Sequence, residues 1–152
     1  MTTELINEFY LIGIAIRTSN ENGQSGIDIP KLWETFMKEN VIDQIPNKLS
    51  PDIYCMYTDY EKDHTMPYTT LLGCRVANLT VIPANMVGKT VIAANYIKYI
   101  AKGDLTEGLV FNQWLKIWEA DLPRAFTADF EVYGEKAQNA QQAEVEIYIA
   151  LN

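Results

Sequence analysis

Residues 111–151 read FNQWLKIWEADLPRAFTADFEVYGEKAQNAQQAEVEIYIAL, and this stretch carries most of the structural information in the chain. It begins with a predicted helix in which apolar residues recur at i, i+3, i+4 and i+7, as Phe111, Trp114, Leu115 and Trp118. Pro123 ends the helix, because proline cannot continue the helical hydrogen-bond pattern. Two strands are predicted after it, around Phe130 and Ile147.

The final strand shows the alternation of a half-buried strand, in which successive side chains point to opposite faces of a sheet. One set should meet the helices: Val145, Ile147, Ile149 and Leu151. The other set faces water or a ligand groove: Glu144, Glu146 and Tyr148. In the preceding strand, Glu131 and Tyr133 share a face by the same rule.

The same order of elements is predicted earlier in the chain. A β-rich run covers residues 9–16, and Asp28 is predicted to cap a helix that has Pro30 in its first turn and runs to about Glu39. Strands at 53–57 and 69–76 flank a charged loop at 59–67. In the second half a strand at 91–100 leads to Thr106, which is predicted to cap the aromatic helix.

Short matches relate the two halves. Trp33-x-x-Phe36-Met37 corresponds to Trp114-x-x-Ile117-Trp118, and residues 53–57 correspond to residues 129–133. We therefore expect one α+β domain over residues 1–152, built from two strand-helix-strand-strand halves at about 1–77 and 91–152. The halves should share a mainly antiparallel sheet, with two main helices and a ligand groove between the halves.

Composition narrows the function. The formal net charge of −8 and the scattered Lys and Arg residues argue against direct nucleic-acid binding, and an acidic surface attracts small cations. Neither a signal peptide nor a membrane-length apolar run is visible, so the expected location is cytoplasmic. Two cysteines fit free thiols in a reducing compartment, with a Cys55–Cys74 cross-strand disulfide as the alternative.

Several sharper interpretations fail. Val87-Gly88-Lys89-Thr90 suggests a phosphate loop, but Pro83 stands where that motif needs glycine. The single His64 gives little support to a metal site or to a Ser/His/Asp triad. No cofactor is implied.

The remaining pattern combines carboxylates with aromatic rings, which suits an organic cation with a flat apolar body. The second half contributes the candidates Glu131, Tyr133, Glu146, Tyr148, Trp114, Trp118, Phe111 and Tyr96. The first half contributes Tyr10, Tyr54 and Tyr57. Glu119 is a weaker candidate, and Met56 and Met66 would line the site or fill the core.

The motifs from Trp114 to Glu119, from Asp129 to Tyr133 and from Val145 to Ile149 resemble the GyrI-like, or AraC-type, effector-binding domain family. This resemblance implies binding of cationic lipophilic compounds in a groove between the halves, with Glu131 at the family's cation-binding glutamate and Tyr148 at its strand tyrosine. The chain departs from the regulators of this family, because the effector module is expected to occupy the whole sequence without a helix-turn-helix domain. Stand-alone members exist, including a drug-binding module encoded by an integron gene cassette, and this chain is similar to that one.

The resemblance also leaves two alternatives open. Some relatives look like hydrolases of electrophilic metabolites, in which case Glu131 or Glu146 would be the base. Another relative inhibits DNA gyrase, which would make the chain an interaction module for a protein partner. A separately encoded DNA-binding protein is one such partner.

Overall fold

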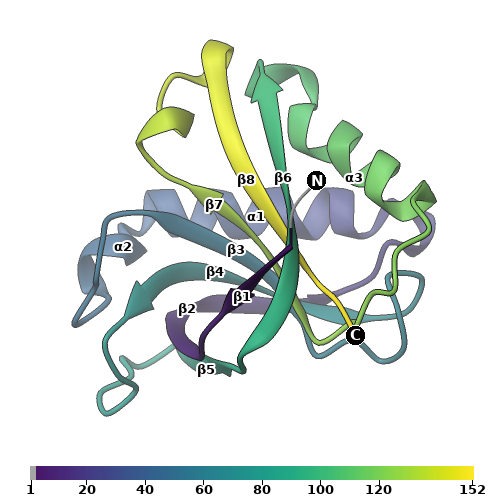
Figure 1. Cartoon of the computed structure of the whole chain (residues 1–152). Coiled ribbons are helices and arrows are strands. Elements are labelled where there is room, and N and C mark those ends of the chain that lie inside the picture. The colour runs from purple at the N-terminus through teal and green to yellow at the C-terminus, as the bar shows by residue number, and fades with distance from the viewer. Residues whose placement is uncertain (1–2) are drawn as a thin grey trace.

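The computed structural model describes residues 3–152, which form one eight-stranded antiparallel sheet and three α-helices (Figure 1). The strand order across the sheet is β1-β6-β8-β7-β3-β4-β2-β5. The first half comprises β1 (Thr3–Ile6), β2 (Phe9–Thr18), α1 (Ser25–Lys38), α2 (Val41–Gln44), β3 (Ile53–Thr58) and β4 (Tyr68–Val76). The rest comprises β5 (Val87–Val91), β6 (Ala94–Gly103), α3 (Leu109–Glu119), β7 (Ala128–Tyr133) and β8 (Ala143–Ala150).

The predicted duplication is visible in the topology. The order β2-α1-β3-β4 recurs as β6-α3-β7-β8, and the sheet order places the two sets symmetrically about its centre. The central pair is β3 and β7, in which Cys55 is the direct antiparallel partner of Glu131. An approximate two-fold relation therefore passes close to these two residues, and Tyr57 in the first half corresponds to Tyr133 in the second.

The two faces of the sheet have different cores. On the helix-bearing face, α1 covers a cluster around Phe36 and Leu72, and α3 covers a cluster around Ile117 and Ile147. The opposite face holds a third cluster around Met56 and Phe130, where the curled sheet packs against itself. As predicted, Val145, Ile147 and Ile149 point toward the helix α3.

The α+β class, the antiparallel sheet and the two main helices are confirmed. The predicted strand at 91–100 is wrong in its limits, because Val91 ends β5 and a separate strand, β6, begins at Ala94. The strands β1 and β5 and the short helix α2 were not predicted from the sequence. Each is short, and a run of four or five residues carries little periodic signal.

Both predicted helix starts are displaced. The first helix begins at Ser25, so Asp28 is not its cap; the Asp28 carboxylate instead accepts hydrogen bonds from Thr18 Oγ1 and Gln24 Nε2, both at 2.9 Å. Thr106 lies in a 3-10 turn, where Asp104 accepts from its backbone N–H. The helix α3 then begins after Gly108, whose φ of 72° is a left-handed conformation that favours glycine.

The two thiols are free and buried. Although β3 and β4 pair, Cys55 lies opposite Leu72 and not opposite Cys74, so the register does not bring the two sulfur atoms together. No helix within residues 3–152 has the length and apolar character needed to cross a bilayer.

Candidate functional site

A cavity of about 660 Å³ opens between the two halves on the helix-bearing face. Its floor is the central strand pair, and its walls come from α1, α3 and the loop between β3 and β4. All three tryptophans of the chain line it: Trp33, Trp114 and Trp118. A volume of this size accommodates a drug-sized molecule.

Glu131 is the acidic group at the floor of this cavity, and it is only 1% exposed. Its carboxylate accepts three hydrogen bonds from neutral donors. Tyr133 Oη donates to Oε1 at 2.6 Å, whereas Tyr57 Oη at 2.7 Å and Trp114 Nε1 at 2.6 Å donate to Oε2. The two tyrosines come from corresponding positions in the two halves, so both halves hold one carboxylate.

Burial raises the pKa of Glu131 above its ordinary value of 4.5, because removal from water penalises the charged form. The three hydrogen bonds favour the carboxylate and oppose this shift. Burial also raises the pKa values of Tyr57 and Tyr133, so both phenols stay protonated and act as donors. The result is a preorganised but poorly solvated negative charge.

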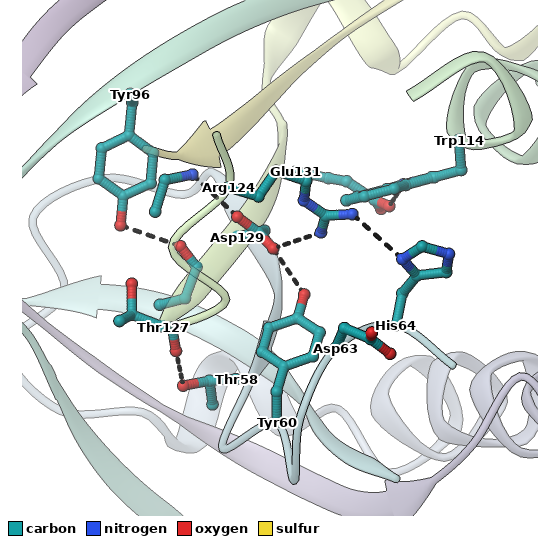
Figure 2. Close-up of polar contacts among 12 residues, drawn as sticks. Thr58, Tyr60, Asp63, His64, Tyr96, Trp114, Arg124, Thr127, Asp129 and Glu131 are labelled. Carbon is teal, nitrogen blue, oxygen red and sulfur yellow. Dashed lines mark hydrogen bonds and ion pairs between the residues drawn. The ribbon is translucent and has the colours of Figure 1, made fainter. Parts of the chain in front are cut away.

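A second polar cluster lies beside Glu131 (Figure 2). Asp129 is fully buried; its Oδ2 accepts from Arg124 Nη2 at 2.8 Å and from Tyr60 Oη at 2.6 Å, and its Oδ1 accepts from the backbone N–H of Ala150 at 2.8 Å. Burial raises the pKa of Asp129, and the Arg124 guanidinium acts against this shift. The pair adds no net charge, so the cavity keeps the single negative charge of Glu131.

Aromatic rings cover the carboxylate in edge-to-face pairs. The ring centroids of Trp33 and Tyr133 are 4.8 Å apart, and those of Tyr57 and Trp114 are 5.3 Å apart. At the outer rim the imidazole of His64 stacks on Trp118 at 5.3 Å with an interplanar angle of 4°. These contacts fix the rings around the charge and leave apolar surface for a ligand.

A family model described as integron-associated effector binding protein matches residues 3–151. The chain belongs to this family. Its members are effector-binding proteins, so the chain falls in a class of binding proteins and not of enzymes. The resemblance to GyrI-like effector domains that the sequence indicated is thereby confirmed.

Three proteins similar to this effector binding protein are informative. YobU of Bacillus subtilis, provisionally named a transcriptional regulator, is 28% identical over 143 residues, which cover 91% of this chain and 89% of YobU. The integron cassette protein VCH_CASS2 from the Vibrio cholerae mobile metagenome is 26% identical, with a TM-score of 0.74 and coverage of 99% and 95%. SAV2435, solved with bound tetraphenylphosphonium, shares the fold at a TM-score of 0.75 and 16% identity, with coverage of 99% and 93%.

Six of the candidates named from the sequence of this effector binding protein meet in the cavity: Glu131, Tyr133, Tyr57, Trp114, Trp118 and Phe111. Phe111 is 59% exposed and stands at the mouth, where its ring packs edge-on against Trp118. Glu119 is exposed at the end of α3 and does not line the cavity.

The candidate Glu146 does not reach the cavity that holds Glu131. Glu131 pairs across the strands with Ile147, so Glu146 points to the opposite face, where it forms an ion pair with Lys98. Tyr148 points to the same opposite face, where its ring stacks on that of Phe130 with the ring centroids 4.8 Å apart.

Three further candidates also lie outside the cavity. Tyr54 and Tyr96 pack on the same opposite face, and Tyr96 Oη donates to the Ala128 carbonyl at 3.1 Å. Tyr10 lies on the helix-bearing face but on β2, two strands away from β3, and donates to Glu8 at 3.1 Å. The suggested Met56 and Met66 lining is also absent, since neither lines the cavity and Met56 is core.

The effector binding protein also has cavity residues that the sequence did not single out: Trp33, Tyr60, His64, Tyr68 and Arg124. Trp33 could have been found, because its motif matches that of Trp114 in the other half. The others, apart from Tyr68, lie in loops and carry no periodic signal. Within residues 3–152, no group of three or more His, Cys, Asp or Glu side chains is placed to hold a metal ion.

The free protein should lose stability as pH rises through the raised pKa of Glu131. The folded state holds this proton more tightly than the unfolded state, so the contribution is complete below the ordinary value of 4.5 and is lost above the raised one. Urea unfolding of wild type and Glu131→Gln over a pH series measures this, because the difference between the two curves isolates Glu131. Parallel curves at every pH would contradict the expectation.

Proposed function

We propose that this effector binding protein takes up cationic, hydrophobic compounds with aromatic bodies in the cavity between α1 and α3. One observation carries the proposal: Glu131 is buried, yet none of the ion pairs formed within residues 3–152 involves it. A buried carboxylate without a counter-ion is unfavourable. A cationic ligand supplies the missing charge, whereas a neutral ligand of the same shape does not.

The walls suit the same ligands. The rings of Trp33, Tyr57, Trp114 and Tyr133 surround the carboxylate, and each well-placed ring adds roughly 0.5–2 kcal/mol to the binding of a cation. The net charge of −8 attracts cations from a distance. The presence of tetraphenylphosphonium, a lipophilic cation, on the similarly folded SAV2435 supports the proposal.

Tryptophan fluorescence provides a direct test, because all three tryptophans line the cavity and no other indole contributes background. We expect saturable quenching by tetraphenylphosphonium at micromolar concentrations and little response to triphenylphosphine oxide, which keeps three phenyl rings but lacks a net charge. An equal response to both compounds would count against charge recognition. No response to either would remove support for the cavity as a cation site.

The proposal includes a regulatory setting, which the relation to YobU supports. The two free thiols fit the reducing cytoplasm, and the signal would pass to a separately encoded DNA-binding protein or another protein partner. Co-purification of the tagged protein from its own host, with and without tetraphenylphosphonium, tests the partner. Identical protein profiles under both conditions would speak against a ligand-dependent partner.

A further inference from the structure

The cluster beside Glu131 contains a buried guanidinium whose donors are only partly used. An arginine carries five N–H donors. Arg124 Nη2 donates to Asp129 at 2.8 Å. Among residues 3–152, Nη1 has only His64 Nδ1 at 3.5 Å, and Nε has no hydrogen-bond partner. The side chain is 4% exposed, so water does not readily satisfy these donors. Buried donors without partners are uncommon and unfavourable.

The Asp129 carboxylate does not explain this surplus. It already accepts from Tyr60, from the Ala150 backbone and from one nitrogen of Arg124. A single charged contact of that kind needs only a lysine, whereas arginine offers a planar set of donors suited to a carboxylate or a similar group. The ion pair therefore accounts for one edge of the guanidinium and leaves the rest available.

The guanidinium belongs to a residue that lines the cavity. Arg124, Tyr60 and His64 all line it, and Figure 2 shows the guanidinium between Asp129 and His64. The Trp114 indole links the two sites, because its Nε1 donates to Glu131 and its ring centroid is 5.9 Å from Arg124 Cζ. A ligand stacked near this indole meets a carboxylate and a guanidinium together.

We infer that the cavity recognises zwitterionic aromatic ligands, in which a cationic centre binds at Glu131 and a carboxylate or similar acceptor group binds at Arg124. This inference rests on the proposed function and adds a second recognition element to the same site. A simple cation leaves the surplus donors of Arg124 without partners, and a simple anion is repelled by Glu131. The Phe126 ring, 4.2 Å from Arg124 Cζ, holds the guanidinium in place.

The neighbouring histidine does not supply a second positive charge for the acceptor group. Burial and the charge of Arg124 lower the pKa of His64, so the imidazole is neutral at physiological pH. Arg124 is then the cation available for a ligand carboxylate at this end of the cavity.

The test compares carboxypropyl triphenylphosphonium, a zwitterion at neutral pH, with its methyl ester, a simple cation of nearly the same shape. In wild type we expect the acid to bind at least as tightly as the ester. The double variant Arg124→Gln/Asp129→Asn replaces both charged side chains with neutral amides. In this variant the affinity of the acid relative to that of the ester should fall by about tenfold or more, which is the effect expected from losing a hydrogen bond to a charged group. Arg124→Lys keeps the charge but removes surplus donors and should lower the ratio severalfold.

The outcomes separate this inference from the proposed function. The zwitterion assignment is overturned if wild type binds the acid about tenfold more weakly than the ester. It is also overturned if the affinity ratio of acid to ester is the same in wild type and in both variants. In either case, binding of the ester still supports cation recognition at Glu131. If neither the acid nor the ester binds, both the inference and the proposed function fail.

Discussion

Replacing Glu131 with glutamine should weaken the binding of tetraphenylphosphonium by about 10- to 100-fold, which corresponds to the roughly 1.5–3 kcal/mol of an interaction with a charged partner. The physical reason is that the buried carboxylate takes part in none of the ion pairs of residues 3–152, so a cationic ligand becomes its direct counter-ion. Tryptophan fluorescence or calorimetric titration of the two proteins measures the change.

The glutamine variant should keep its fold. Its amide oxygen can take the place of Oε2 and accept from Tyr57 and Trp114, and its amino group can donate to the Tyr133 oxygen in place of Oε1. The substitution therefore removes charge while retaining three hydrogen bonds. Any loss of affinity then reports the charge and not a collapse of the cavity.

Glu146→Gln is the matched control. It makes the same chemical change on the neighbouring strand, but the side chain points away from the cavity toward Lys98. Tetraphenylphosphonium affinity should be unchanged in this variant, and triphenylphosphine oxide should not discriminate among the three proteins. An unchanged affinity in Glu131→Gln, or an equal loss in both variants, would show that Glu131 is not the cation site.

Replacing Arg124 with methionine should lower the free energy of unfolding by about 3–5 kcal/mol, because it leaves the buried Asp129 charge without its partner. The carboxylate is fully buried and would keep only the neutral donors Tyr60 and Ala150 N–H. Chemical denaturation at neutral pH measures the loss, and the variant should recover part of it at acidic pH, where Asp129 takes up a proton.

Two other variants provide controls for this prediction. Arg124→Gln/Asp129→Asn removes both charges, and it should be much more stable than Arg124→Met because no buried charge is left unpaired. Lys102→Met breaks the exposed ion pair with Glu144 and should change stability by less than about 1 kcal/mol. A loss below about 1 kcal/mol in Arg124→Met would contradict the structural role given to the buried pair.

Alternation along single strands predicted much of the fold. It placed Glu131 and Tyr133 on one face and set Val145, Ile147 and Ile149 against a helix, as the structure shows. Alternation within one strand says nothing about which residue lies opposite on the next strand. The register places Ile147 opposite Glu131. The candidates Glu146 and Tyr148 are each one residue away from Ile147, so their side chains point to the other face of the sheet.

The polar half of the site was beyond prediction for a different reason. Tyr60 follows β3 and Arg124 precedes β7, at the end of the central pair where Thr58 lies opposite Ala128. In the sequence 63 residues lie between Tyr60 and Arg124, yet both side chains bind Asp129. No local pattern links such residues, since their contact is created by the pairing of β3 with β7. By contrast, Trp33 and Trp114 occupy matching positions in the two halves, so comparing the halves could have predicted that both line the site.

The pairing of Cys55 with Glu131 at the centre of the sheet has a consequence for how such a protein can arise. In a dimer of two identical half-size chains, every side chain near the two-fold axis would occur twice. A glutamate there would face its own copy, and two facing carboxylates oppose each other's ionisation. Once both halves are encoded in one polypeptide, the two central positions mutate independently. A single carboxylate can then stand at the centre of the sheet. A thiol facing one carboxylate is an arrangement that two identical half-size chains cannot form.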